Sequence, residues 1–180
     1  MKLTLILGPM KSGKSFELIN YFAPLKYTKQ NFALFHPASN VRDEQINSRN
    51  GVYIESVKIQ TIKNLIDGDY SIIGIDEIHM FPESEAEFIE QLLKKGTEII
   101  ISGLDMDHAG RLFPIVQKLM EMGPAEIKMK KAVCELCQDH NATYTQVLYN
   151  NEPIAKNLPP SIPDDGTFTY KPVCRKCFIK

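Results

Sequence analysis

The chain has 180 residues, of which 43% are hydrophobic and 24% are charged. This composition is typical of a globular protein and excludes collagen, coiled coil and long disordered tracts. The 21 basic and 22 acidic residues leave a formal net charge of −1, which excludes an overall basic surface for nucleic acid or an anionic membrane. The longest N-terminal apolar stretch, residues 3–7, is too short to cross a bilayer. We therefore expect a cytoplasmic protein with no nucleic-acid partner and no membrane partner.

Strands and helices are expected to alternate from the N-terminus onward. Most expected strands are apolar runs, and the expected helices carry apolar residues at helical spacing. In chain order the sequence predicts a buried strand over 2–7, a helix over 15–22 that stops or kinks at Pro24, a strand over 31–35, a long polar surface loop over 36–51, an edge strand over 52–57, a short helix over 61–66 and a strand over 70–75.

The clearest helix in the sequence starts at Pro82 and is terminated by Gly96. Its acids Glu83, Glu85 and Glu87 complement the positive helix end, and we interpret them as a solvated face rather than a metal site. The elements expected after it are a strand over 98–102 and a helix over 113–122 whose inward residues are Val116, Leu119 and Met120. Strands that alternate with helices in this way imply an α/β fold with a mostly parallel sheet covered on its faces.

The sequence pattern changes after Gly123-Pro124. The remainder of the chain holds all four cysteines, a proline-rich tract and short β-like pieces such as 142–149. We therefore expect two domains, an α/β nucleotide-binding domain over residues 1–123 and a small second domain over residues 124–180.

The segment that follows the first expected strand matches the phosphate-binding loop G-x-x-x-x-G-K-[ST] in full. In such a loop the glycines let backbone N–H groups point at phosphate oxygens, the lysine reaches the outer phosphates, and the final hydroxyl ligates Mg²⁺. The alternative is a glycine turn with two solvated lysines. The sequence thus predicts a phosphate and Mg²⁺ site built from Gly8, Pro9, Met10, Lys11, Ser12, Gly13, Lys14 and Ser15.

Two acids follow the expected strand over 70–75. A phosphate-loop protein needs an acid at the end of a neighbouring strand to hold Mg²⁺, and Asp76 has that position. The adjacent Glu77 can accept the proton of an attacking hydroxyl or water. Either acid could instead serve as a helix N-cap. Together with the phosphate loop, the pair predicts phosphoryl transfer or hydrolysis.

The four cysteines form two C-x₂-C pairs, Cys134 with Cys137 and Cys174 with Cys177. Two such pairs are typical of a closed tetrahedral Zn²⁺ site, which is structural because it leaves no open position for a substrate. A redox role would need only one pair. His140 is an alternative fourth ligand. We expect a structural zinc with the four cysteines as ligands.

Taken together, these motifs resemble the zinc-bearing, tetrameric type of thymidine kinase over nearly the whole chain. The segments that carry the resemblance are the loop 8–15, Ile75 to Phe81, Ser102 to Asp105, Phe113-Pro114, Ala132 to Cys134 and Pro172 to Cys177. The resemblance implies a RecA-like P-loop domain, a zinc-binding domain that carries a long loop called the lasso, and a homotetramer. It also implies transfer of the ATP γ-phosphate to the 5′-hydroxyl of a deoxynucleoside, with Glu77 as general base and Arg42 near the transferred phosphate.

The resemblance also implies a set of residues around the nucleoside base. By position these are Met10, Leu104, His108, Phe113, Thr145 and Tyr170. Several positions depart from the family: Lys11, Met80 and His108 replace common aromatic residues, His79 replaces a glutamine, and the lasso over 146–169 contains Pro153, Pro159, Pro160 and Pro163. Proline cannot donate a backbone hydrogen bond, so the base contacts cannot all be those of the family.

Three hypotheses follow from the sequence. The first is a thymidine kinase that takes deoxyuridine as its second substrate. The second keeps the kinase chemistry but has another nucleoside as its preferred substrate. The third is a P-loop ATPase whose zinc module binds a partner, although Lys128, Lys130 and Lys131 form the only local basic cluster.

Overall fold

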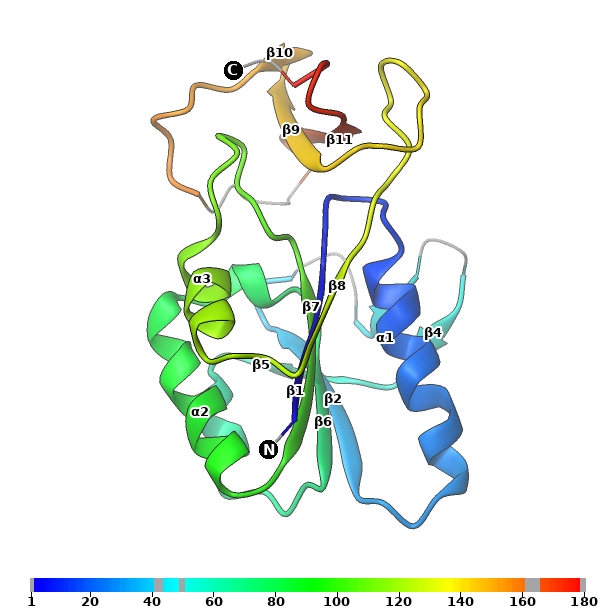
Figure 1. The fold of residues 1–180 in the computed structure, drawn as a ribbon, viewed down its shortest axis with the longest axis vertical. Coiled ribbons are helices and arrows are strands. Elements are labelled where there is room, and N and C mark those ends of the chain that lie inside the picture. Colours follow the sequence, from blue (N-terminus) through cyan, green and yellow to red (C-terminus); the bar gives the residue numbers. More distant parts are fainter. Residues whose placement is uncertain (1, 41–43, 49–50, 161–165, 179–180) are drawn as a thin grey trace.

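The computed structural model describes residues 2–40, 44–48, 51–160 and 166–178. Its centre is a six-stranded sheet with the strand order β5-β2-β6-β7-β1-β8 (Figure 1). The strands are β1 (Leu3–Leu7), β2 (Phe32–Pro37), β5 (Val57–Ile59), β6 (Ile72–Ile75), β7 (Glu98–Gly103) and β8 (Glu126–Met129). All five pairings in this sheet are parallel, which confirms the α/β class with a mostly parallel sheet.

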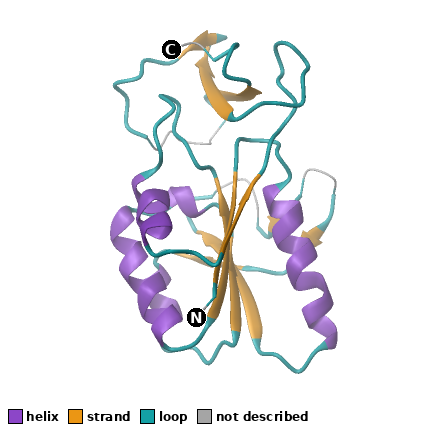
Figure 2. Cartoon of the chain, in the orientation of Figure 1, coloured by secondary structure: helices purple, strands orange, loops and turns teal. Residues whose placement is uncertain are grey.

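Helices cover both faces of the sheet. Helix α1 (Lys14–Phe22) packs on one face, and α2 (Ala86–Lys94) and α3 (Pro114–Glu121) pack on the other (Figure 2). Along β1, Leu5 and Leu7 face the core under α2 and α3, whereas Ile6 faces the core under α1. Burial on both faces explains why this strand is an unbroken apolar run rather than an alternating one.

Within the described part of the sheet region there are also four 3₁₀ helices: η1 (Ala23–Tyr27), η2 (Ile62–Leu65), η3 (Ile78–Met80) and η4 (Glu83–Glu85). The predicted short helix over 61–66 is η2. The backbone continues from α1 directly into η1, so the chain changes helix type next to Pro24 instead of stopping there. The helix predicted from Pro82 begins as η4 and becomes α-helical at Ala86.

The predicted edge strand over 52–57 is wrong. In that region β4 (Tyr53–Ile54) pairs antiparallel with β3 (Ile46–Asn47), outside the central sheet, and the sheet edge is β5. The pair buries Ile46 and Ile54 against the core under α1, so burial rather than alternation decides the pairing. The predicted polar loop over 36–51 therefore contains a strand.

The interpretation of Glu85 as part of a solvated face is also wrong. Its side chain is buried and accepts hydrogen bonds from the Thr61 hydroxyl at 2.8 Å and from the Ile62 backbone N–H. These contacts satisfy donors at the start of η2, which explains why a carboxylate is buried here. Glu83 and Glu87 are exposed, as predicted.

The C-terminal module (residues 130–178) contains a three-stranded antiparallel sheet in the order β10-β9-β11. Its strands are β9 (Tyr144–Tyr149), β10 (Glu152–Pro153) and β11 (Thr169–Val173). The predicted boundary at residue 123 lies before β8, but β8 pairs with β1 in the central sheet. The chain thus leaves that sheet after Met129, and we place the proposed domain boundary there. Among the described residues, none of the helices has the length and apolar character needed to cross a lipid bilayer.

Candidate functional site

The phosphate loop connects the end of β1 to the start of α1 and rests against β8. At its root the Lys130 backbone N–H donates to the Leu7 carbonyl at 2.7 Å. Gly8 has a φ of +150°, and a Cβ there would lie 2.5 Å from the Lys130 carbonyl oxygen, so a side chain does not fit. Gly13 has a φ of +79° and turns the backbone into α1. The predicted loop residues therefore lie together between strand and helix.

Two side chains of the loop fold back over its own backbone. The Lys14 ammonium and the Ser12 hydroxyl each donate to the Pro9 carbonyl at 2.8 Å, and both side chains are buried. The lysine is thus held inside the turn, next to the backbone N–H groups of the loop. A phosphate placed there would meet one full positive charge and the positive end of α1.

Asp76 lies at the carboxyl end of β6, beside the phosphate loop. It is buried, and its Oδ1 accepts from the Ser102 hydroxyl and from the Glu77 N–H at 3.0 Å. Burial, followed by the nearby charge of Glu77, raises the pKa of Asp76 to about 6. The hydroxyls of Ser102 and Ser15 act in the opposite direction because they hydrogen-bond to the carboxylate. The predicted Mg²⁺ residues Ser15 and Asp76 are therefore in contact.

Glu77 has a left-handed backbone with φ +52° and ψ +41° at the start of η3. Such a conformation costs a residue other than glycine about 1–3 kcal/mol and is often found at functional sites. Gly103 of β7 lets the next residue, Ile78, pack closely on the strand, because a Cβ at Gly103 would lie 2.7 Å from the Ile78 Cγ2. Among the described residues, the Glu77 Oε2 is buried with no hydrogen-bond partner. The structure thus holds an acceptor without a donor beside the phosphate loop.

His79 stands next to this carboxylate but forms no charged pair with it. Its Nδ1 accepts the Leu104 N–H at 3.3 Å and lies 3.4 Å from the Glu77 Oε2. Burial, and then the charge of Lys14, lower the pKa of His79 to about 3. The ring is therefore neutral, with its proton on Nε2. The resulting lone pair on Nδ1 explains why the short distance to Oε2 is not a hydrogen bond.

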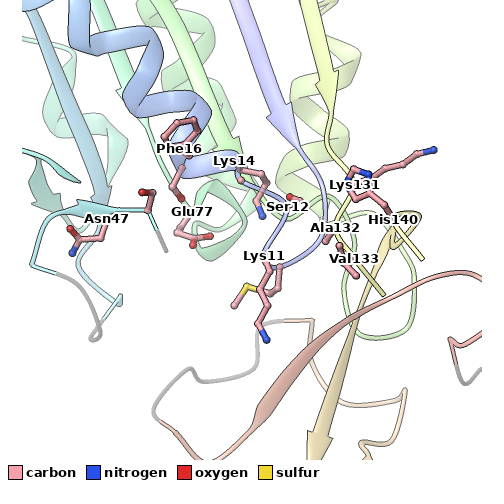
Figure 3. Close-up of a pocket in the computed structure, with 14 residues that line it drawn as sticks. Lys11, Ser12, Lys14, Phe16, Asn47, Glu77, Lys131, Ala132, Val133 and His140 are labelled. Atoms are coloured by element: carbon pink, nitrogen blue, oxygen red, sulfur yellow. The ribbon is translucent and has the colours of Figure 1, made fainter. Parts of the chain in front are cut away.

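A cavity of about 500 Å³ opens over the phosphate loop (Figure 3). Its lining residues are Met10 to Phe16, Asn47, Ser48, Glu77, Lys131, Ala132, Val133 and His140. A second cavity of about 20 Å³ is lined by Ser15, Asp76 and Glu77 together with His36, Asn40, Gln45, Ile46 and Asn47. This mainly polar space has room for about one water molecule. Glu77 thus lines both cavities together with residues of the phosphate loop, and Asp76 lines the smaller one.

The residues expected around a nucleoside base form two contacts that join distant segments. The Met10 N–H donates to the Thr145 hydroxyl oxygen at 3.0 Å, which connects the phosphate loop to β9. Leu104 and Phe113 both contact His79, whose ring centroid lies 5.0 Å from that of Phe113. Met10 and Thr145 therefore meet where the phosphate loop contacts β9, whereas Leu104 and Phe113 lie around His79 in the sheet region.

The other expected residues are less completely placed. His108 is buried, and neither of its ring nitrogens has a hydrogen-bond partner among the described residues. Tyr170 is half-buried on β11, opposite Val147 of β9. Arg42, expected near the transferred phosphate, lies outside the described residues.

The four cysteines form one cluster, and their sulfur atoms all lie within 4.8 Å of one another. The Sγ atoms of Cys137 and Cys174 are 3.8 Å apart. A tetrahedral zinc with Zn–S bonds of about 2.3 Å requires an S–S separation of about 3.8 Å. Within the described part of the chain, His140 does not join this cluster. The cysteine positions, which β9 and β11 bring together, therefore fit a zinc ion without a histidine ligand.

Comparison with protein-family models matches residues 1–178 to the family described as thymidine kinase. The chain belongs to the thymidine kinase family. The match covers the sheet, the acid pair and both cysteine pairs, and it confirms the resemblance inferred from the motifs. Members of this family are nucleoside kinases, so the chain is a phosphotransferase.

For this family member, sequence reasoning did not assign several residues that line the large cavity. In the sequence, Lys131 is part of a basic cluster and His140 is a possible zinc ligand. Val133 belongs to the segment Ala132 to Cys134 that resembles the family's cysteine motif, with no role of its own implied. All three lie in the C-terminal module, far from the phosphate loop in sequence, but line the same cavity. A signal was present in the sequence, since a lysine and a histidine flank the first cysteine pair.

Proposed function

We propose that the chain is a thymidine kinase that transfers the γ-phosphate of ATP to the 5′-hydroxyl of thymidine. The observation that carries the proposal is the convergence of Lys14, Ser15, Asp76 and Glu77 at one cavity system. Ser15 hydrogen-bonds Asp76, while Lys14 and Glu77 line one cavity. Phosphoryl transfer needs a phosphate cradle, a metal site and a group that orients the attacking hydroxyl.

The donor is held by the phosphate loop. Backbone N–H groups of residues 8–15 and the Lys14 ammonium would bind the phosphate oxygens. Ser15 and Asp76 would hold Mg²⁺, and they fit this ion because a hydroxyl and a carboxylate are oxygen ligands lying in contact. When bound, Mg²⁺ neutralises charge on the phosphates. The low polarity around Asp76 strengthens its attraction for a cation.

Glu77 acts as the general base. Its buried Oε2 has no hydrogen-bond donor among the described residues, so it can accept the proton of the 5′-hydroxyl directly. Its left-handed backbone fixes the carboxylate at the end of β6. Arg42 is proposed, from the resemblance alone, to approach the transferred phosphate.

The nucleoside base lies among Met10, Leu104, His108, Phe113, Thr145 and Tyr170. In this proposal thymidine is the best substrate and deoxyuridine the second, because one methyl-sized group contributes only about 1–3 kcal/mol. Deoxycytidine and purine nucleosides are poor, because an unpaired buried polar group costs more than a lost methyl contact.

A deoxynucleoside kinase with a different preferred base is the second candidate. His108 favours it, since its two buried ring nitrogens lack partners among the described residues. A nucleobase with an additional polar group could form a hydrogen bond with one of these nitrogens, whereas the thymine methyl group cannot. The two candidates share the phosphoryl-transfer chemistry and differ only in the nucleoside.

Structural zinc and self-association complete the proposal. Zinc bound by Cys134, Cys137, Cys174 and Cys177 would tie β9 and β11 at their ends, and reduced thiolates agree with a cytoplasmic location. A homotetramer is supported by β8, an edge strand with the apolar side chains of Ile127 and Met129 exposed. Light scattering on the zinc-loaded protein tests this assembly.

A nucleoside panel tests the function. The zinc-loaded protein is incubated with Mg-ATP and thymidine, deoxyuridine, deoxycytidine or a purine deoxynucleoside, and the products are separated by chromatography. The proposal predicts thymidine 5′-monophosphate with the highest kcat/KM. A larger value for deoxycytidine or a purine nucleoside would support the second candidate. Phosphate release without any nucleotide product would instead support an ATPase whose zinc module binds a partner.

A further inference from the structure

The large cavity has two ends on opposite sides of the phosphate loop. In Figure 3, Glu77 and Asn47 lie on one side of the loop, and Lys131, Val133 and His140 lie on the other. We call the second group, with Ala132, the module end of the cavity, because these residues belong to the C-terminal module. The proposed chemistry at Glu77 assigns no role to the module end.

The module end is held firmly against the phosphate loop. Ala132 and Ala142 exchange backbone hydrogen bonds of 3.1 and 2.9 Å, and the Cys134 N–H donates to the Asp139 carbonyl at 2.8 Å. These bonds fix the turn that carries His140 next to Val133. Lys130, immediately before this segment, is bonded to Leu7 at the loop root. The first cysteine pair and the phosphate loop are therefore parts of one continuous surface.

Lys131 differs from the other lysines around the loop. Lys128 and Lys130 each contact Glu17 at 2.9 Å, and Lys11 pairs with Glu135. The paired lysines lower the pKa of Glu17 through their hydrogen bonds, so the carboxylate is charged and neutralises part of their charge. Lys131 has no carboxylate partner among the described residues, and its side chain is exposed at the cavity. It is a cation available to an anionic ligand.

The position of the proposed general base, Glu77, sets the direction in which a bound phosphate donor lies across the loop. If Glu77 accepts the proton of the nucleophile, the transferred phosphate lies at the Glu77 side of the loop, and the rest of the donor extends away from it. We propose that the module end binds the α-phosphate and the nucleoside of the triphosphate donor, so that the zinc-binding module forms part of the donor site. This inference rests on the proposed function only for the direction of the donor.

The chemistry of the module end suits that ligand. Lys131 provides the charge for the α-phosphate. Val133 is 52% exposed and presents apolar surface to the face of a base, and the exposed His140 ring can pack beside it. The volume of about 500 Å³ lies in the usual range for a small-molecule site. The structure thus assigns a ligand-binding role to residues that the zinc site holds in place.

Direct binding measurements test this proposal without turnover. The Kd of β,γ-imido ATP and of inorganic tripolyphosphate is measured by calorimetry, with Mg²⁺, on the zinc-loaded protein and its variants. We expect Lys131→Ala to raise the Kd of both ligands about 3- to 10-fold, because both ligands have a phosphate that can occupy the α-phosphate position. The double variant Val133→Ala, His140→Ala should raise the Kd of the ATP analogue about 5-fold. The Kd of tripolyphosphate should stay within about 2-fold of wild type.

Lys128→Ala is the matched control, because Lys128 lies nearby on β8 but does not line the cavity. It should leave both Kd values within about 2-fold of wild type. Zinc content is measured for every variant, and His140→Ala alone replaces the double variant if the latter loses zinc. Unchanged Kd values in Lys131→Ala, or equal losses of both ligands in the double variant, would overturn the proposal. Absence of any nucleoside phosphorylation would contradict the proposed function, but a Kd that depends on the module end would still support this site.

Discussion

The sheet region (residues 2–129) and the C-terminal module are held together by different means. In the sheet region, β1 is buried along its whole length between two large apolar clusters. The buried cluster of the module is small and consists of Ala132, Cys134, Ala142, Val173, Cys174 and Phe178. Two of these residues are expected zinc ligands. Apolar burial can stabilise the sheet region by itself, whereas the small module would depend on the proposed zinc ion.

This difference divides the proposed function between the two regions. The sheet region carries the phosphate loop and the acid pair, which serve the chemistry. The module carries Thr145, which is bonded to the phosphate loop through Met10, and residues of the large cavity. Loss of the module should therefore impair substrate binding and leave the sheet folded.

Removal of zinc is expected to have the largest effect. Structural zinc contributes about 10–16 kcal/mol of apparent binding energy in small zinc domains, so Cys174→Ser should unfold the module. Hydrogen exchange should become fast at Val147 of β9 and remain slow at Ile73 of β6. Lys176→Ser, an exposed change between the same two cysteines, is the control and should retain zinc. Fast exchange in both regions would contradict the claim that the sheet region stays folded when the module unfolds.

Lys14→Ala should remove catalysis without unfolding the sheet region. The ammonium would stabilise charge on the phosphates, and loss of one such group typically costs about 10²–10³-fold in kcat. Thymidine kinase assays and thermal unfolding measure the two effects separately. A small loss of activity together with a large fall in Tm would assign Lys14 to folding instead. The exposed Lys29→Ala variant serves as the control for both readouts.

Asp76→Asn should stabilise the Mg²⁺-free protein at neutral pH. The folded pKa of Asp76, about 6, exceeds the ordinary value of 3.8, so the folded state disfavours its charge. The resulting cost is absent below pH 4 and grows as pH rises through 6, reaching about 2–3 kcal/mol. Urea unfolding of the zinc-loaded protein without Mg²⁺ should show a gain in stability for the variant at pH 7.5 that largely disappears by pH 4. A gain independent of pH would exclude this cause.

Thr145→Val tests the bond between the two regions and should have the smallest effect. It leaves the Met10 N–H without its acceptor, which costs about 1–2 kcal/mol. We expect the Kd of thymidine to rise about 5- to 30-fold while zinc stays bound. The matched control is Thr143→Val, at the residue directly before β9. It should change the Kd of thymidine by less than about 2-fold. Equal changes in Kd for the two variants would contradict a role of the Met10–Thr145 hydrogen bond in thymidine binding.

The sequence predicted the parts of the site that depend on local pattern. The apolar run 3–7, the phosphate loop after it and the acids after 70–75 all lie where expected, because each motif is continuous in the chain. Two C-x₂-C pairs predicted one cluster, because zinc spacing is a property of the motif.

The remaining features depend on contacts between distant segments. Glu85 has the pattern of a solvated helix acid, but it is buried because Thr61 and Ile62 supply donors. Residues 126–129 follow a Gly-Pro break and alternate in polarity, so their parallel pairing with β1 could not be read from composition. Likewise, only the folded chain brings Lys131 and His140 to the phosphate loop.

Single-turnover phosphorylation of thymidine by the Glu77→Gln variant tests the central claim most directly. Glutamine keeps the size of the side chain but cannot accept the proton of the 5′-hydroxyl as a carboxylate does. The account predicts that the rate of the chemical step falls about 10²–10⁴-fold while the Kd values of thymidine and of the ATP analogue stay within about 3-fold of wild type. A chemical step as fast as in wild type would contradict the assignment of Glu77 as the base.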